Sequence, residues 1–174
     1  MRVPPQSFEH SEAVTGCKTH SLQTVSAPDN VCVAIAVSKY NESITSRLVD
    51  GAVARLNAAG VSSDRIEIAE VPGAFELPLA ASVLAESGRF AALLCLGAVI
   101  RGETTHDQHI NTAVANGVEC VGRQHGVPVL FGLLTCETQG QAEARAGGNV
   151  GNKGEECAEA AIAMMNLLAD LSKK

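Results

Sequence analysis

Aromatic residues are scarce in this chain. They make up 3% of its 174 residues, with one Tyr, four Phe and no Trp. A hydrophobic core must therefore be built from aliphatic side chains and Ala, which suit close packing of helices against a sheet. Hydrophobic residues still account for 46% of the sequence, enough for the core of one domain.

Basic stretches and long apolar runs are also missing. The formal net charge is -6, and no segment is basic enough to form a nucleic-acid surface. No apolar run approaches the length of a membrane-spanning helix. The N-terminal sequence MRVPPQSFEH lacks the apolar core of a signal peptide. These absences predict a protein of the reducing cytoplasm with neither nucleic acid nor membrane as a partner.

Metal-ligand spacing is absent as well. None of the six cysteines forms a C-x-x-C pair. Cys32, Cys95 and Cys136 lie within or at the ends of apolar runs, where a free thiol behaves as a small hydrophobe. His106 and His109 are one helical turn apart but lack the rest of a zinc-protease pattern. We therefore expect buried thiols and no metal site.

Apolar runs alternate with amphipathic segments along most of the chain. Strands are predicted at 31–37, 65–71, 90–100 and 127–135, where apolar residues are continuous or alternate with polar ones. Helices are predicted at 44–60, 75–88, 104–126, 139–146 and 152–172, from apolar residues that recur every three or four positions.

This alternation predicts an α/β fold of the flavodoxin-like kind, a three-layer α/β/α sandwich around a four-stranded parallel sheet. Residues 30–174 are assigned to that domain. Residues 1–29 are polar and contain Pro4, Pro5 and Pro28, and we expect them to form a flexible arm. Such an arm can also become ordered by adding a strand to a neighbouring subunit's sheet.

Unusual polar sequences follow the predicted strands, at the edge where open parallel sheets bind ligands. Tyr40 follows the first strand, where its ring either stacks on a heteroaromatic ligand or covers the end of the sheet. Phe75 and Glu76 follow the turn Pro72-Gly73 after the second strand. Glu76 either accepts hydrogen bonds from ligand hydroxyls or complements the dipole of the next helix.

The third strand ends in LGAVIRGETTHDQ, residues 96–108. Thr105 and Gln108 fit a capping box, which makes His106 the first helical residue. The free N–H groups and positive dipole at that end favour an anion, a phosphate above all, and Gly102 allows it to approach the backbone. The same dipole favours the neutral imidazole of His106, which suits proton transfer. A plain helix cap with a surface histidine accounts for the same residues, and the Glu103 carboxylate would have to point away from an anion.

A glycine-rich segment, RAGGNVGNKGEEC, precedes the last predicted helix. Lys153 is followed by Gly154 instead of Ser or Thr, so the segment is not a P-loop. The absence of G-x-G-x-x-G argues against a dinucleotide site. Arg145 and Lys153 remain candidate partners for phosphate or carbonyl groups, Arg145 through its fork of donors.

Four motifs in this order resemble the 6,7-dimethyl-8-ribityllumazine synthase family, over about residues 31–170: VPGAFELPLAA, LGAVIRGETTH, GVPVLFGLLT and RAGGNVGNKGEECAEAAIAM. The resemblance implies a transferase that catalyses the penultimate step of riboflavin biosynthesis. Its substrates would be 5-amino-6-(D-ribitylamino)uracil and 3,4-dihydroxy-2-butanone 4-phosphate. Its products would be the lumazine, phosphate and water, and it would use no cofactor.

The resemblance also implies roles for individual residues. Tyr40, where the family usually has Phe or Trp, would stack on the pyrimidine. Residues 74–76 would line the ribityl chain, and residues 98–100 would bind the pyrimidine through backbone groups. Phe131 would close the ring pocket from an adjacent subunit, and Lys153 would lie near the pyrimidine. The implied ring and ribityl set is Tyr40, Ala74, Phe75, Glu76, Ala98, Val99, Ile100, Phe131 and Lys153.

The phosphate and the proton transfer fall to other residues by the same resemblance. Gly102, Glu103 and Thr104 would hold the phosphate through N–H groups and a hydroxyl, and Arg145 would pair with it. His106 would be the catalytic proton-transfer residue. Small residues are frequent in the family at the Glu103 position, and an aromatic residue often follows soon after the histidine, where this chain has Asp107-Gln108.

Family members are homo-oligomers, and the resemblance implies a pentamer. Some members assemble into sixty-subunit icosahedral shells, and the segment RAGGNVGNKG has no insertion that would exclude a shell. A riboflavin synthase is a candidate partner. Three other functions fit parts of the sequence: a flavin or lumazine carrier without His106 and Arg145 chemistry, a purely structural shell protein, and a flavodoxin-type redox protein with a different phosphate loop.

Overall fold

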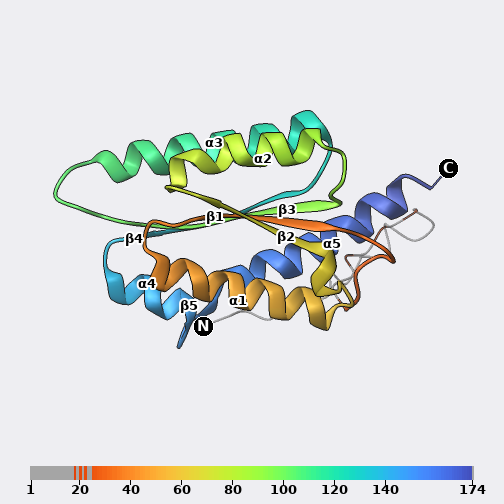
Figure 1. Cartoon of the computed structure of the whole chain (residues 1–174), viewed down its shortest axis with the longest axis horizontal. Coiled ribbons are helices and arrows are strands. Elements are labelled where there is room, and N and C mark those ends of the chain that lie inside the picture. The colour runs from red at the N-terminus through yellow and green to blue at the C-terminus, as the bar shows by residue number, and fades with distance from the viewer. Residues whose placement is uncertain (1–17, 19, 21, 23–24, 174) are drawn as a thin grey trace.

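The structure is a computed structural model that describes residues 18, 20, 22 and 25–173. Its main strands are β1 (Val33–Ser38), β2 (Ile66–Val71), β3 (Ala92–Ile100) and β4 (Val129–Cys136). Its helices are α1 (Glu42–Ala58), α2 (Leu77–Glu86), α3 (His106–His125), α4 (Gln139–Arg145) and α5 (Lys153–Leu171). Helices α2 and α3 lie side by side on one face of the sheet, and α1, α4 and α5 lie on the other (Figure 1). The predicted three-layer α/β/α fold is therefore confirmed.

The four main strands form one parallel sheet in the order β2-β1-β3-β4. Each crossover between neighbouring strands runs through a helix, as parallel pairing requires. The carboxyl ends of the strands gather on the left of Figure 1, where the loops to α1, α2, α3 and α4 begin. The ligand edge predicted for such a sheet is therefore on that side.

Alternate residues of each central strand pack into two separate hydrophobic cores, one on each face of the sheet. In β1, Val33, Ile35 and Val37 pack with α1 and α5, whereas Ala34 and Ala36 face α2 and α3. Strand β3 alternates in the same way, and all residues from Ala92 to Ala98 are buried. Because both faces are covered, these strands have continuous apolar sequences.

Helices α1 and α5 cross at an unusually short distance. Asn152 is the N-cap of α5: its Oδ1 accepts hydrogen bonds from the N–H groups of Gly154 and Glu155 at 2.8 and 3.3 Å. Its Nδ2 donates to the carbonyl oxygen of Arg47 in α1 at 2.8 Å. A Cβ atom on Gly154 would lie 1.9 Å from the carbonyl oxygen of Leu48, so the crossing leaves no room for a side chain.

The helix and strand boundaries differ from the predicted ones mostly by one to three residues. The helix expected from residue 75 begins instead as a 3-10 turn, Ala74–Glu76, and continues as α2 with Pro78 in its first turn. A short antiparallel hairpin of β5 (Ala146–Gly148) and β6 (Gly151–Asn152) occupies the glycine-rich segment and was not predicted. Most of the expected N-terminal arm lies outside the described residues, so its flexibility stays a prediction.

Two cysteines lie deep in the cores. Burial raises the pKa of the Cys95 thiol to about 12 and that of the Cys157 thiol to about 11. Cys32 and Cys136 are partly buried, and the cysteines of the described chain are free thiols. These groups behave as the small hydrophobes expected from their apolar surroundings. None of the described helices is long and apolar enough to cross a membrane.

Candidate active site

Most of the predicted site residues lie at the carboxyl edge of the sheet. Tyr40 follows β1 and is 73% exposed, and Phe75, in the turn after β2, is 60% exposed. Ala74 is buried beside them, and residues 98–100 are the last three of β3. The register pairs Ser38 with Val71, so β1 and β2 end together and bring these two loops to the same edge. An exposed aromatic ring on each loop is what a planar ligand needs for stacking.

Strand β3 extends beyond its neighbour β1. The β1–β3 pairing stops at Val37–Leu96, whereas the β3–β4 pairing continues to Ile100–Cys136. Main-chain groups of alternate residues point to the same edge of a strand. Arg101 donates its N–H to the carbonyl oxygen of Cys136 in β4 at 2.8 Å, so Val99 also faces β4 and Ile100 faces the opposite edge. The N–H and C=O of Ile100 therefore face the side on which β1 has already ended.

The loop between β3 and α3 leads into the helix end at which the sequence predicts an anion site. Gly102, Glu103, Thr104 and His106 are all exposed, and His106 is the first residue of the 20-residue helix α3. The predicted capping box is wrong. Thr105 makes no side-chain cap, and the Thr104 hydroxyl instead accepts a long hydrogen bond from the His106 N–H at 3.4 Å. The Gln108 N–H donates to the main-chain carbonyl oxygen of Thr105 at 3.1 Å, so the first turn is capped by main-chain and Thr104 contacts and not by the Thr105 side chain.

This loop is tied to the end of β4. Arg101 forms an ion pair with Glu137 (Nη1 to Oε2, 2.9 Å), in addition to its main-chain bond to Cys136. The thiol of Cys136 is close enough to Arg145 for the guanidinium to oppose the rise in its pKa that burial causes. Cys136 thus stands between the loop that precedes α3 and the arginine at the end of α4.

Arg145 is held in a fixed orientation by Glu156. Its Nη1 and Nη2 donate to the two Glu156 carboxylate oxygens at 2.8 Å each, and Nη1 also donates to the carbonyl oxygen of Val150 at 2.9 Å. The hydrogen bonds from Arg145 to Glu156 raise the pKa of the guanidinium. Lys153 Nζ is 3.8 Å from the same carboxylate. Arg145 and Lys153 therefore both pair with the Glu156 carboxylate.

Glu76 makes the helix-start contact that was one of its two predicted roles. Its Oε2 accepts a hydrogen bond from the Gly73 N–H at 3.0 Å, as an acid at the start of a helix does. Glu76 as a whole is only partly buried. The two interpretations are compatible, because this contact uses one of the two carboxylate oxygens.

Phe131 does not lie with the other residues. It is the third residue of β4 and pairs with Cys95, five residues before the end of β3. At a rise of about 3.3 Å per residue, that places it roughly 16 Å back from the carboxyl edge. Its side chain is nevertheless 37% exposed. Phe131 therefore lies well back from the carboxyl edge that carries the other predicted site residues.

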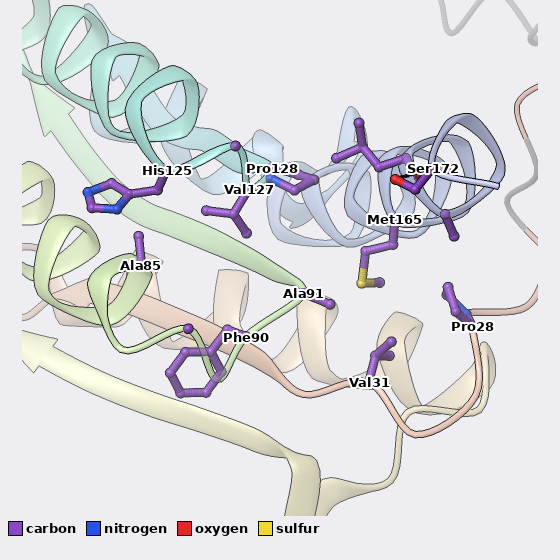
Figure 2. A pocket seen from close by; sticks show the side chains of 14 residues that line it. Pro28, Val31, Ala85, Phe90, Ala91, His125, Val127, Pro128, Met165 and Ser172 are labelled. Atoms are coloured by element: carbon purple, nitrogen blue, oxygen red, sulfur yellow. Dashed lines mark hydrogen bonds between the residues drawn. The ribbon is translucent and has the colours of Figure 1, made fainter. Parts of the chain in front are cut away.

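The cavity drawn in Figure 2 is at the opposite edge of the sheet. Its volume is about 410 Å³, and it is lined by Phe90, His125, Pro128, Met165 and Ser172 among others. Pro128 immediately precedes β4, so this cavity marks the amino ends of the strands. It contains none of the predicted site residues, and the rule for open parallel sheets places the ligand at the other edge.

At the carboxyl edge of the sheet, the sequence patterns did not identify two polar side chains that contact the predicted site residues. Asn41 precedes α1 and resembles an ordinary helix cap, and Glu156 in the first turn of α5 resembles an acid that complements the dipole. Neither residue carries a local signal for its actual partner. Within the described residues, no three His, Cys, Asp or Glu side chains gather as a metal site would require.

One family model matches the chain. It is the model of 6,7-dimethyl-8-ribityllumazine synthase, and it covers residues 30–169. The match includes all four main strands and nearly all of α5. It also includes every residue of the candidate site.

Proposed function

The chain belongs to the 6,7-dimethyl-8-ribityllumazine synthase family, and on that premise we propose the reaction that it catalyses. The family's activity makes the protein a transferase of riboflavin biosynthesis. The proposed substrates are 5-amino-6-(D-ribitylamino)uracil and 3,4-dihydroxy-2-butanone 4-phosphate, and the proposed products are 6,7-dimethyl-8-ribityllumazine, phosphate and water. The observation that carries the proposal is the pairing, at one sheet edge, of an open strand end with the exposed N-terminus of helix α3.

The pyrimidine would lie against the open end of β3. The N–H and C=O of Ile100 match the amide-like edge of a pyrimidinedione, and Tyr40 offers an exposed ring for stacking. The ribityl chain would extend toward Ala74, Phe75 and the partly buried Glu76. Lys153 would approach the ring from the start of α5.

The phosphate would lie at the start of α3. Gly102, Glu103 and Thr104 would offer main-chain N–H groups and a hydroxyl, with the helix dipole adding to the attraction. Glu103 is exposed, so its carboxylate can stay in solvent while its N–H faces the ligand. Arg145, charged and held by Glu156, would pair with the phosphate oxygens.

The chemistry then follows from holding two substrates together. The aryl amine attacks the ketone, and loss of water leaves an imine. The hydroxyl-bearing carbon next to the imine then loses a proton, and phosphate leaves the terminal carbon with the electron pair of its C–O bond, which gives an enol that becomes a ketone. The ribitylamino nitrogen attacks this ketone, and loss of a second water closes the ring. His106, adjacent to the phosphate-binding loop, would carry protons between these groups as a general acid and base.

We further propose that the site is completed by a second copy of this chain. Phe131 is exposed but lies roughly 16 Å from the carboxyl edge of its own chain, which favours a role in closing the ring pocket of a neighbour. Phe75, Leu79 and Val83 form an exposed apolar stripe along one side of α2, which also favours self-association. A pentamer, a sixty-subunit icosahedral shell, a riboflavin synthase partner and a cytoplasmic location remain predictions from the sequence.

The test of the reaction is to mix the two substrates with the protein and follow lumazine absorbance. We expect a rate above the protein-free background that saturates in both substrates, with one phosphate released per lumazine. A carrier would bind lumazine without accelerating its formation, and a structural shell protein would do neither. Either of those results would contradict the proposed enzyme.

Arg145→Ala is expected to raise KM for the phosphorylated ketone by about 10- to 100-fold, the range for a lost hydrogen bond to a charged group. KM for the pyrimidine should change far less, because Arg145 is assigned to the phosphate alone. Steady-state kinetics with each substrate varied in turn measures both constants. Arg123→Ala, which removes an arginine paired with Glu119 near the other end of α3, is the matched control. Equal increases in the two KM values would argue against a phosphate-binding role.

A further inference from the structure

The loop after β1 is fastened on both sides. Lys39 donates its N–H to the carbonyl oxygen of Val71 at 2.8 Å, and Tyr40 donates its N–H to that of Pro72 at 3.2 Å. On the other side, the Asn41 side chain donates from Nδ2 to the carbonyl oxygen of Ala98 at 2.9 Å. The loop that carries Tyr40 is therefore held between the ends of β2 and β3.

Asn41 adopts a backbone conformation that few residues tolerate. Its φ and ψ are 60° and 44°, in the left-handed region where asparagine is enriched among residues other than glycine. An asparagine that precedes a helix normally caps it with its side chain. Here the main-chain carbonyl of Asn41 accepts from the N–H groups of Ile44 and Thr45 at 2.8 and 3.1 Å, and no side-chain cap is made. The amide is thereby directed across the sheet edge.

The Asn41 amide donates to the carbonyl oxygen of Ala98. Ala98 is the first residue of β3 that faces the β1 side after the pairing between the two strands has ended. Strand pairing to β1 stops at Leu96, and Ala98 is 2% exposed, so its carbonyl would otherwise be buried without a strand partner. The Asn41 amide replaces the missing strand at Ala98. The next residue that faces the same edge is Ile100.

We propose that Asn41 is a positioning residue for the pyrimidine, because it occupies Ala98 and leaves Ile100 as the main-chain edge that the ring meets. The same contact holds the adjacent Tyr40 beside that edge. This inference rests on the proposed function and deepens it by specifying which main-chain groups form hydrogen bonds with the pyrimidine ring. Of the three β3 residues expected to bind the pyrimidine, Ala98 is engaged by Asn41 and Val99 faces β4, so Ile100 alone offers both main-chain groups.

Asn41→Gly is the sharpest test, because glycine keeps the left-handed backbone while the amide is lost. We expect KM and Kd for 5-amino-6-(D-ribitylamino)uracil to rise about fivefold to tenfold, the effect of a lost hydrogen bond. KM for the phosphorylated ketone should stay within about twofold, because its groups lie on α3 and α4. Asn41→Asp should raise the pyrimidine constants at least as much, since a carboxylate cannot donate to Ala98.

The matched control is Asn30→Gly. Asn30 has the same left-handed φ of 59° but precedes β1 at the opposite edge of the sheet. It should leave both KM values unchanged. Thermal unfolding of all the variants separates positioning from a general loss of stability, because a structural role would lower Tm and raise both KM values together.

The outcomes separate the two proposals. A wild-type protein that forms lumazine, with Asn41→Gly binding the pyrimidine as tightly as wild type in calorimetry, overturns the role of Asn41 alone. Equal increases in both KM values with a lowered Tm also overturn it. A wild-type protein that neither forms lumazine nor binds the pyrimidine overturns the proposed function and this inference together.

Discussion

Gly154→Ala is expected to lower the free energy of unfolding by about 3 kcal/mol, near the upper end of the usual cost of overpacking. The added Cβ would lie 1.9 Å from the Leu48 carbonyl oxygen, a backbone atom that cannot rotate away. Helices α1 and α5 would have to separate, which would also strain the Asn152 bonds to Arg47 and to the first turn of α5. A loss of that size is a large part of the stability of an ordinary domain.

Gly140→Ala is the control for this prediction. Gly140 is also in a helix, α4, but a Cβ there meets no atom within 4 Å. Alanine should therefore stabilise the protein by roughly 0.5 kcal/mol through its better helix propensity. Urea unfolding at one fixed protein concentration measures both variants, since assembly makes stability depend on concentration. Similar midpoints for the two variants would show that the crossing can relax.

His106→Ala is expected to slow turnover by about 10²- to 10⁴-fold, the usual contribution of a general acid or base. Its side chain is exposed at the first position of α3, so the fold and the assembly should survive the change. The two KM values should move little if His106 transfers protons without holding either substrate. Single-turnover kinetics followed by lumazine absorbance measures the chemical step directly.

His109→Ala is the matched control for His106. It lies three residues further along α3 and is likewise exposed, so it removes the same chemical group from the same helix. We expect its turnover to match wild type. An unchanged kcat in His106→Ala, or an equal loss in both variants, would remove His106 from the catalytic role.

The layered fold follows from local patterns, because burial on both faces of a strand gives a continuous apolar run and burial on one face of a helix gives apolar residues every three or four positions. Val33 and Ala34 illustrate this: both are buried, in different cores, and their strand was recognisable as one continuous apolar run. The start of α3 at His106 was also predicted, whereas its cap was not. Thr104 and Thr105 are the same residue type at adjacent positions, so the sequence does not distinguish them as caps. The backbone conformation decides that the Thr104 hydroxyl accepts the hydrogen bond from the His106 N–H.

The sequence alone therefore determined the order of elements, the two covered faces of the sheet and the edge where polar residues gather. Tertiary structure decided which of those polar groups remain open to a ligand. The contact from Asn41 to Ala98 spans 57 positions, and the length by which β3 passes β1 depends on the register between separate strands. Such pairings depend on distant segments meeting in space, and hydrophobic periodicity carries no information about their register beyond the face that each residue occupies.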